Sequence, residues 1–354
     1  MQPIEFPLYN LESEFIPVFE PQVYTNPDLN SGCGVTDLEG FIGGKWQSDG
    51  NLYSRYCFAK QKIKHNAEHE LLVNGRLLAV LNEQQIILTE QNSLILADLT
   101  GENTDRKLTF DCEKEEVVTG FTFLCSEKII GLAGTVIMDG EVARRYLKIC
   151  DFLPETPVIT AEIEIDLDAK YVLSGQTVFV HYKSDLCVYD LNLQPVNHPL
   201  TDVWNQYSGN VQALAVNGKH SFAVCAVADS KNKESTLLRL IMWGSKPEDW
   251  LEVLLLDSCR IDHLAFSPDG EWLLLSNCNR KDQSKQLYLL PVEKRLSYHL
   301  AQPVKINNCC MDHKNLFWSD NSRQLVKINE YQVLRWNIES LNKRLFSRYS
   351  RAGY

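Results

Sequence analysis

The feature that most constrains the fold of this chain is a strand, tight turn and strand unit that recurs along most of its length. It is clearest at residues 261–277, IDHLAFSPDGEWLLLSN, where apolar runs flank a polar turn. Pro268 presets the φ angle of the second position of a type I turn, Asp269 suits the third position, and Gly270 supplies the positive φ that reverses the chain. Two antiparallel strands are therefore expected here.

Similar turns precede similar strands elsewhere, which indicates an internal repeat. In five of six units, the turn lies 22 to 26 residues before the end of the third strand of the unit. The ends of these strands are 39 to 54 residues apart from one unit to the next. A further strand candidate after each end, such as RKLTF or LEVLLL, makes the unit four strands long, and about 40–50 residues per repeat is typical of a propeller blade. The turns lie at Asn74 and Gly75, Ser126 and Glu127, Gly175, Asn217 and Gly218, Asp269, and His313, and the strands end at Asp98, Asp151, Asp190, Gly244, Pro291 and Asn337.

The segments LAFSPDGEWLLLSN and LYLLPV, and more weakly LCVYDL and VLRWNI, resemble the WD-repeat β-propellers. The resemblance covers about residues 67–346, without that family's Gly-His pair or its closing Trp-Asp, so none of its structural residues is transferred. It implies an all-β β-propeller of four-stranded antiparallel blades. Six units are visible and residues 35–63 supply a seventh, so we expect seven blades, with six or eight as alternatives.

Three segments are expected along the chain. Residues 1–34 contain five prolines and five acidic residues but no Lys or Arg, which predicts an extended acidic segment over the surface. The propeller should occupy residues 35–346, and its ring would close with strands from both termini, which removes free sheet edges. Residues 347–354 form a short basic tail.

Composition narrows the class of protein. A net charge of -11 disfavours general attraction to nucleic acid or to an anionic membrane. The first residues lack a signal peptide, and the longest apolar run, residues 129–138, is far shorter than the roughly 20 residues that span a bilayer. The 11 cysteines include no CxxC pair, which favours buried thiols in a reducing compartment. A soluble cytoplasmic protein is expected, with the nucleus as an alternative.

Three local motifs could indicate chemistry. HNAEH, from His65 to His69, fits an inverted zinc-protease motif, but a strand follows at once and leaves no helix to hold the two His. GFIGGKW, at residues 40–46, lacks the glycine spacing and the hydroxyl residue of a phosphate loop. NNCCMDH, at residues 307–313, puts neighbouring thiols on opposite faces of a strand. We therefore expect no catalytic residue, metal site or cofactor.

Binding features lie in the loops. Loops between second and third strands should share one face with the blade-to-blade connections, and two consecutive ones are basic. Aromatic residues in the connection DVWNQYSGN could add an interface hot spot. The candidate partner-binding residues are Trp204, Tyr207, Lys231, Lys233, Arg280, Lys281 and Lys285, each of which could instead be an ordinary loop or packing residue.

The expected function is a non-catalytic protein-protein interaction platform, a subunit or adaptor of a complex that binds through propeller loops. A rigid scaffold that presents many loops suits this role. Two alternatives stay open: a propeller hydrolase with a metal in the central channel, and recognition of an anionic ligand or nucleic acid through the basic loops.

Overall fold

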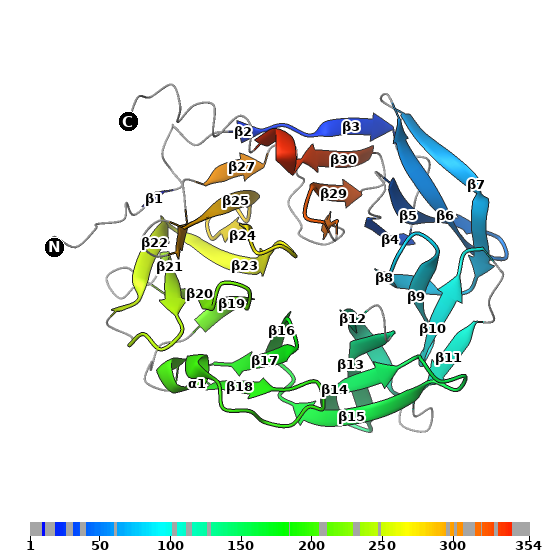
Figure 1. The fold of residues 1–354 in the computed structure, drawn as a ribbon, viewed down its shortest axis with the longest axis horizontal. Coiled ribbons are helices and arrows are strands. Elements are labelled where there is room, and N and C mark those ends of the chain that lie inside the picture. Colours follow the sequence, from blue (N-terminus) through cyan, green and yellow to red (C-terminus); the bar gives the residue numbers. More distant parts are fainter. Residues whose placement is uncertain are drawn as a thin grey trace.

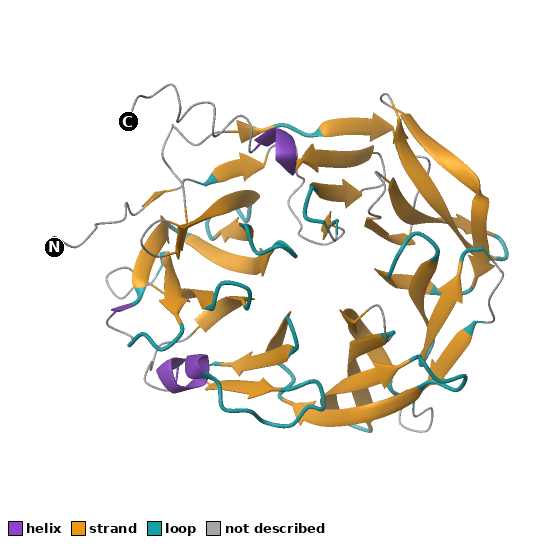
Figure 2. Ribbon diagram, in the orientation of Figure 1, coloured by secondary structure: helices purple, strands orange, loops and turns teal. Residues whose placement is uncertain are grey.

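The computed structural model confirms an all-β propeller whose seven antiparallel blades stand around a central opening (Figure 1). Each blade starts with an inner strand and continues outward. Strands make up most of the ribbon in Figure 2, with loops and a few short helical segments between them. The structure describes residues 9–10, 18–25, 31–35, 40–59, 62–100, 105–110, 115–125, 129–183, 185–204, 211–228, 234–246, 249–294, 298–300, 303–306, 316–319, 321–328 and 332–341.

The strands of each blade follow the chain from the channel outward, except that the fourth strand of blade 7 comes from the other end of the sequence. Blade 1 contains β4 (Ser31–Val35), β5 (Gly40–Gln47), β6 (Gly50–Ala59) and β7 (Lys62–Val73); blade 2 contains β8 (Arg76–Val80), β9 (Gln85–Glu90), β10 (Ser93–Asp98) and β11 (Arg106–Thr109). Blade 3 contains β12 (Val117–Cys125), β13 (Ile130–Asp139), β14 (Val142–Asp151) and β15 (Val158–Ile165); blade 4 contains β16 (Lys170–Ser174), β17 (Thr177–Tyr182) and β18 (Asp185–Tyr189), followed by the helix α1 (Pro199–Trp204). Blade 5 contains β19 (Val211–Asn217), β20 (Phe222–Ala228), β21 (Thr236–Met242) and β22 (Leu251–Leu256); blade 6 contains β23 (Cys259–Phe266), β24 (Trp272–Asn279), β25 (Lys285–Lys294) and β27 (Val304–Ile306), with β26 (Tyr298–Leu300) also paired to β25; blade 7 contains β28 (Leu316–Trp318), β29 (Gln324–Ile328), β30 (Gln332–Asn337) and β3 (Gln22–Thr25).

The N-terminal segment adds strands to the outer edges of three blades. β1 (Tyr9–Asn10) pairs in parallel with β22, and β2 (Val18–Phe19) pairs in parallel with β27. β3 pairs antiparallel with β30 as the fourth strand of blade 7, and the indole Nε1 of Trp336 donates to the carbonyl of Phe19 at 3.2 Å. Strands from opposite ends of the sequence thus close the ring, as Figure 1 shows at its upper edge.

The first strands of the propeller begin ahead of residue 35, where the sequence pattern placed its start. β3 lies wholly within the segment expected to run over the surface, and β4 begins at Ser31. β3 has only four residues, too few for an alternating pattern that could be recognised in the sequence. The C-terminal tail, residues 347–354, lies outside the described residues.

The repeat spacing located the blades well. The six predicted strand ends lie within two residues of the ends of the third strands of blades 2 to 5 and 7, and within β25 in blade 6. Two turns are placed differently. Asn74 and Gly75 join β7 of blade 1 to β8 of blade 2, because a turn sequence marks a reversal without showing which strands it joins. His313 is outside the described residues, and the first turn of blade 7 runs from Ser319 to Gln324. The predicted turn at Ser126 and Glu127 also lies outside the described residues.

The apolar core is divided among the junctions between blades. One cluster packs Leu254 of β22 with Leu273 and Leu275 of β24, so it joins blade 5 to blade 6. Others join blade 2 to 3, 3 to 4, 4 to 5 and 6 to 7. Burial of one such side chain contributes about 1.5–3 kcal/mol to the free energy of folding. Because each cluster contains side chains of two neighbouring blades, its burial stabilises both blades.

Hydrogen bonds join the first turns of blades 4 to 7 on one face of the ring. The SPDG turn of blade 6 contributes to two of them, and its Gly270 has the expected positive φ, 73°. The backbone N of Gly218 donates to Ser174 Oγ (2.9 Å), Asn217 Nδ2 donates to the carbonyl of Gly270 (2.8 Å), and the backbone N of Asp269 donates to Ser322 Oγ (2.9 Å).

Candidate binding face and channel pocket

The hairpin formed by β13 and β14 extends beyond the rest of blade 3. Val136 and Arg145 lie level with Val117 of β12 and Ile165 of β15. The hairpin continues for three more residue pairs, from Ile137 and Arg144 to Asp139 and Val142. It is a loop between a second and a third strand, so the antiparallel order places it on the same face as the blade-to-blade connections.

Exposed apolar side chains are concentrated on blade 3 and the connection that leaves it. Of the twelve large apolar side chains that are strongly exposed among the described residues, seven belong to this region. Four of them, which we call the hairpin-end group, lie at or beside the protruding hairpin: Val117, Met138, Val142 and Leu167. The other three, Leu153, Val158 and Ile159, lie at the opposite end of the outer strands.

Arg145 connects the base of the hairpin to the connection between blades 3 and 4. Its Nη1 donates to the carbonyls of Leu167 (3.2 Å) and Ala169 (2.6 Å), and its guanidinium lies 5.8 Å from the centre of the Tyr171 ring. The Tyr171 hydroxyl in turn approaches Gly134, where a Cβ atom would lie only 3.0 Å from it. The two blades are therefore held together directly beneath the hairpin-end group.

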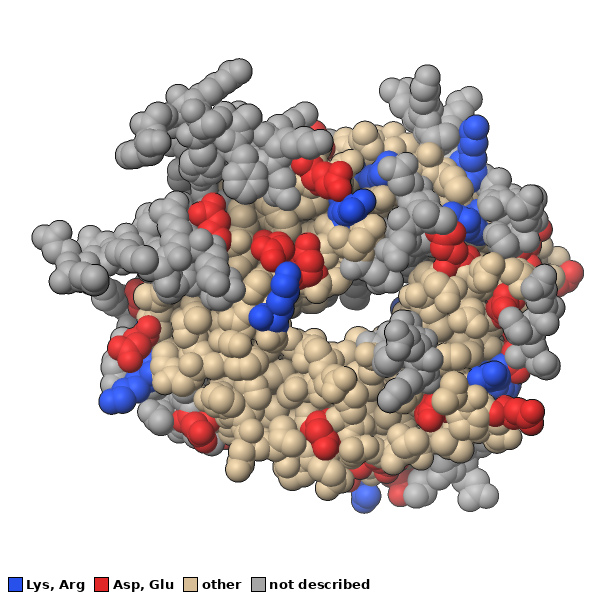
Figure 3. Space-filling view, viewed as in Figure 1, with Lys and Arg blue, Asp and Glu red and all other residues tan. Residues whose placement is uncertain are grey.

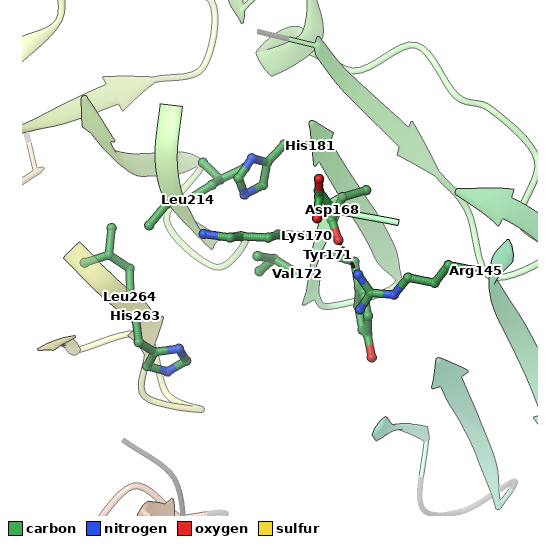
Figure 4. Close-up of a pocket in the computed structure, with 11 residues that line it drawn as sticks. Arg145, Asp168, Lys170, Tyr171, Val172, His181, Leu214, His263 and Leu264 are labelled. Atoms are coloured by element: carbon green, nitrogen blue, oxygen red, sulfur yellow. Dashed lines mark hydrogen bonds between the residues drawn. The ribbon is translucent and has the colours of Figure 1, made fainter. Parts of the chain in front are cut away.

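A cavity of about 430 Å³ lies beside this connection, between the inner strands of blades 4, 5 and 6 (Figure 4). Its charged and polar lining includes Arg145, Asp168, Lys170, His181 and His263. Leu214 and Leu264 supply an apolar wall on the side of blades 5 and 6. We call this cavity the channel pocket.

Two groups dominate the electrostatics of the channel pocket. His181 is only 3% exposed, and burial, with a smaller contribution from the Lys170 ammonium, lowers the pKa of His181 to about 4. The imidazole is therefore neutral at pH 7. Lys170 extends beneath it and donates from Nζ to the carbonyl of Gln212 at 2.7 Å (Figure 4). Burial also raises the pKa of Tyr171, although Arg145 opposes this shift.

The predicted aromatic site is not at the surface. Trp204 ends helix α1 and is fully buried, where it packs near the rings of His181 (6.4 Å) and Trp250 (6.5 Å) between blades 4 and 5. Trp204 is therefore not exposed as expected, because the helix turns this apolar side chain inward to cover the blade junction. Its contact with a partner stays a prediction. Tyr207 lies outside the described residues.

The predicted basic loops are described only in part. Lys231 and Lys233 lie outside the described residues, whereas Arg280 and Lys281 are exposed in the loop between β24 and β25. Lys285 begins β25 and is half-buried. In the view of Figure 3, Lys and Arg side chains alternate with Asp and Glu around the coloured part of the rim, which has no large area of one sign. Whether these residues bind a partner stays a prediction.

The sequence motifs considered for chemistry lie in strands where they are described. His65 to His69 belong to β7 and Gly40 to Trp46 to β5, so neither forms the helix or loop that its motif would require. Residues 307–313 are outside the described part of the chain. Within that part, no group of three or more His, Cys, Asp or Glu side chains is placed to share a metal ion, and no helix is long and apolar enough to cross a membrane.

The hairpin-end group and the channel pocket were not found from the sequence. One signal was available, since MDGEV puts apolar Met138 and Val142 on both sides of a tight turn where polar residues are usual. The pocket had no such signal, because its residues come from strands of four blades.

Comparisons with known proteins agree on the fold. No protein-family model and no curated protein matches the sequence. Among solved structures, an oligogalacturonate lyase from Vibrio parahaemolyticus is similar at a TM-score of 0.54 and 11% identity, over 89% of this chain and 91% of that one. An oligogalacturonate lyase in complex with manganese gives 0.50 and 10%, over 92% and 98%. The Pyrococcus horikoshii acylaminoacyl peptidase gives 0.52 and 9%, over 89% and 51%. At such low identity the likeness shows only the fold, a seven-bladed β-propeller.

Proposed function

We propose that this chain is a non-catalytic interaction platform that binds a protein partner through the hairpin-end group of blade 3. The observation that carries the proposal is the concentration of exposed apolar side chains on blade 3 and the connection that leaves it. This region has seven of the twelve among the described residues, and four of these seven form the hairpin-end group. Clustered exposed apolar side chains mark interaction sites, whereas single ones are ordinary on any surface.

The support of the group favours the same role. Met138 and Val142 lie on paired strands near the end of the hairpin and project from its two opposite faces. Arg145 fixes the neighbouring connection through two hydrogen bonds. A surface held on rigid strands loses little conformational entropy on binding, which favours affinity. The strand and turn order of LAFSPDGEWLLLSN additionally supports a WD-repeat-like propeller as the scaffold.

Recovery of the protein from its native cells would test the proposal. The double variant Met138→Glu, Val142→Glu puts two charges into the group and should reduce the recovered partner about tenfold or more, as expected for the centre of an interface. Both residues are exposed, so the fold should persist.

Leu72→Glu is the matched control. Leu72 is 46% exposed, close to the 42% of Met138, and it ends the outer strand of blade 1 on the same face. We expect this variant to retain the partner. Equal recovery with the double variant and the wild-type chain would contradict the proposal.

A further inference from the structure

We propose that the channel pocket binds a carboxylate group, held by Lys170 and His181. This site is separate from the partner-binding surface, because neither Met138 nor Val142 lines the pocket. The inference therefore goes beyond the proposed function and does not depend on it.

His181 is the first reason to expect a ligand. Its side chain is nine-tenths buried or more and lines the pocket, yet its ring nitrogens form no hydrogen bond with any described residue. Buried polar groups nearly always have a hydrogen-bond partner, so one that faces a cavity without one calls for an occupant. A neutral imidazole has one N–H group to donate.

Lys170 and Arg145 supply the charge. The Lys170 ammonium has three donors and gives one to the carbonyl of Gln212. Arg145 donates to backbone carbonyls from Nη1 alone, which leaves its Nε and Nη2 donors without a partner among the described residues. The Lys170 ammonium beside the buried His181 N–H group forms a site for an oxyanion, because charge-assisted hydrogen bonds are the strong ones. The Arg145 guanidinium adds positive charge to another part of the lining.

Asp168 selects among oxyanions. It lines the same cavity and repels negative charge, so the Lys, Arg, Asp and Glu side chains of the lining are two cations and one anion. This balance suits a single negative charge better than the two of a phosphate near neutral pH. The Leu214 and Leu264 wall favours an aliphatic arm on the ligand, and about 430 Å³ lies within the usual range for small-ligand pockets.

The test uses the full chain and two probes, propionate and a blocked pentapeptide with one Glu between glycines. Each is titrated while the ring signals of His181 are followed by NMR, with His181→Phe used to assign them. We expect saturable shifts, and Lys170→Gln should weaken binding about tenfold, as expected when one charged hydrogen bond is lost.

Lys219→Gln is the control for loss of one positive charge. Lys219 lies in the first turn of blade 5, pairs with Glu271 at 3.0 Å and does not line the pocket, so binding should be unchanged. Absence of a His181 shift at any probe concentration would overturn the proposal. So would equal affinity of the wild type and Lys170→Gln.

The two probes distinguish the source of the carboxylate. Tighter binding of the peptide indicates an acidic side chain of a protein, and equal binding indicates a free organic acid. Failure of both probes would leave partner binding by the hairpin-end group intact, because that surface is tested by different substitutions.

Discussion

Blades 6 and 3 have the same strand order but expose very different surfaces. The first turn of blade 6 is hydrogen-bonded to those of both neighbours, and β2 covers its outer edge. In blade 3, β15 is the outermost described strand, the hairpin protrudes, and apolar side chains face solvent. Blade 6 thus contributes to closing the ring, whereas blade 3 has surface left over for binding.

If blade 3 is a rigid platform for a partner, its interior must be well ordered although its surface exposes apolar side chains. Lys148 Nζ lies 2.7 Å from the buried carboxylate of Glu116. It also lies 2.8 Å from the carboxylate of Glu162, whose side chain is 45% exposed. Lys148→Ala should destabilise the protein by about 3–5 kcal/mol, because it leaves the Glu116 charge buried without its partner. Denaturant unfolding monitored by circular dichroism would measure the loss.

Lys107→Ala is the control for this ion pair. The Lys107–Glu90 pair has the same kind of geometry at 3.0 Å but is exposed, so the loss should be at most about 0.5 kcal/mol. Similar losses for the two variants would mean that blade 3 has no strong internal polar network.

The free energy of unfolding should fall in acid because of His181, which lines the channel pocket. The folded-state pKa of His181, about 4, is below the ordinary value of 6.5, so between these values the unfolded chain binds a proton that the folded protein excludes. The stability from neutral His181 is fully present above pH 6.5 and lost as the pH falls toward 4, by about 3 kcal/mol. The free energy of unfolding of His181→Phe should vary less with pH over this range. Parallel pH profiles would show that His181 is not buried as described.

A glycine-to-alanine substitution in one turn of each blade should change the free energy of unfolding least. It also compares the two blades most directly, because the same chemical change is made in both. Gly270 has φ 73° and would place a Cβ atom 2.8 Å from Asn217 Oδ1, whereas Gly140 has φ 62° and open space around it. Gly140→Ala should cost about 1 kcal/mol for the left-handed backbone alone. Gly270→Ala should cost about 2 kcal/mol, because the hydrogen bond from Asn217 is also disturbed. Thermal unfolding of the two variants would reveal the difference, and equal costs would argue against a clamped turn in blade 6.

Sequence reasoning succeeded where the chain repeats itself. The SPDG turn and the spacing of strand ends such as Asp151 and Asn337 predicted the blades, since turn chemistry and strand length are local properties. Closure by strands from both termini was expected, but the residues of β3 were not identified, because its pairing with β30 joins segments more than 300 residues apart, which no local pattern encodes.

The candidate site was harder to predict for the same reason. Trp204 was expected at the surface because it lies in a connection, but burial depends on the junction that α1 covers. Lys170 and His181 face each other on paired strands of blade 4, but Arg145 comes from blade 3, Leu214 from blade 5 and Leu264 from blade 6, so no local sequence pattern shows the pocket. The repeat predicts how a blade is built, whereas the departures from it in blade 3 carry the proposed function.

Site-specific photo-crosslinking in the native cells tests the central claim most directly. A photoreactive amino acid would replace Met138 on the blade 3 hairpin in one protein and Leu72 on blade 1 in another, two positions of nearly equal exposure. We predict a discrete protein adduct from position 138 and none of that size from position 72. An adduct from position 72 together with none from position 138 would contradict partner binding by blade 3.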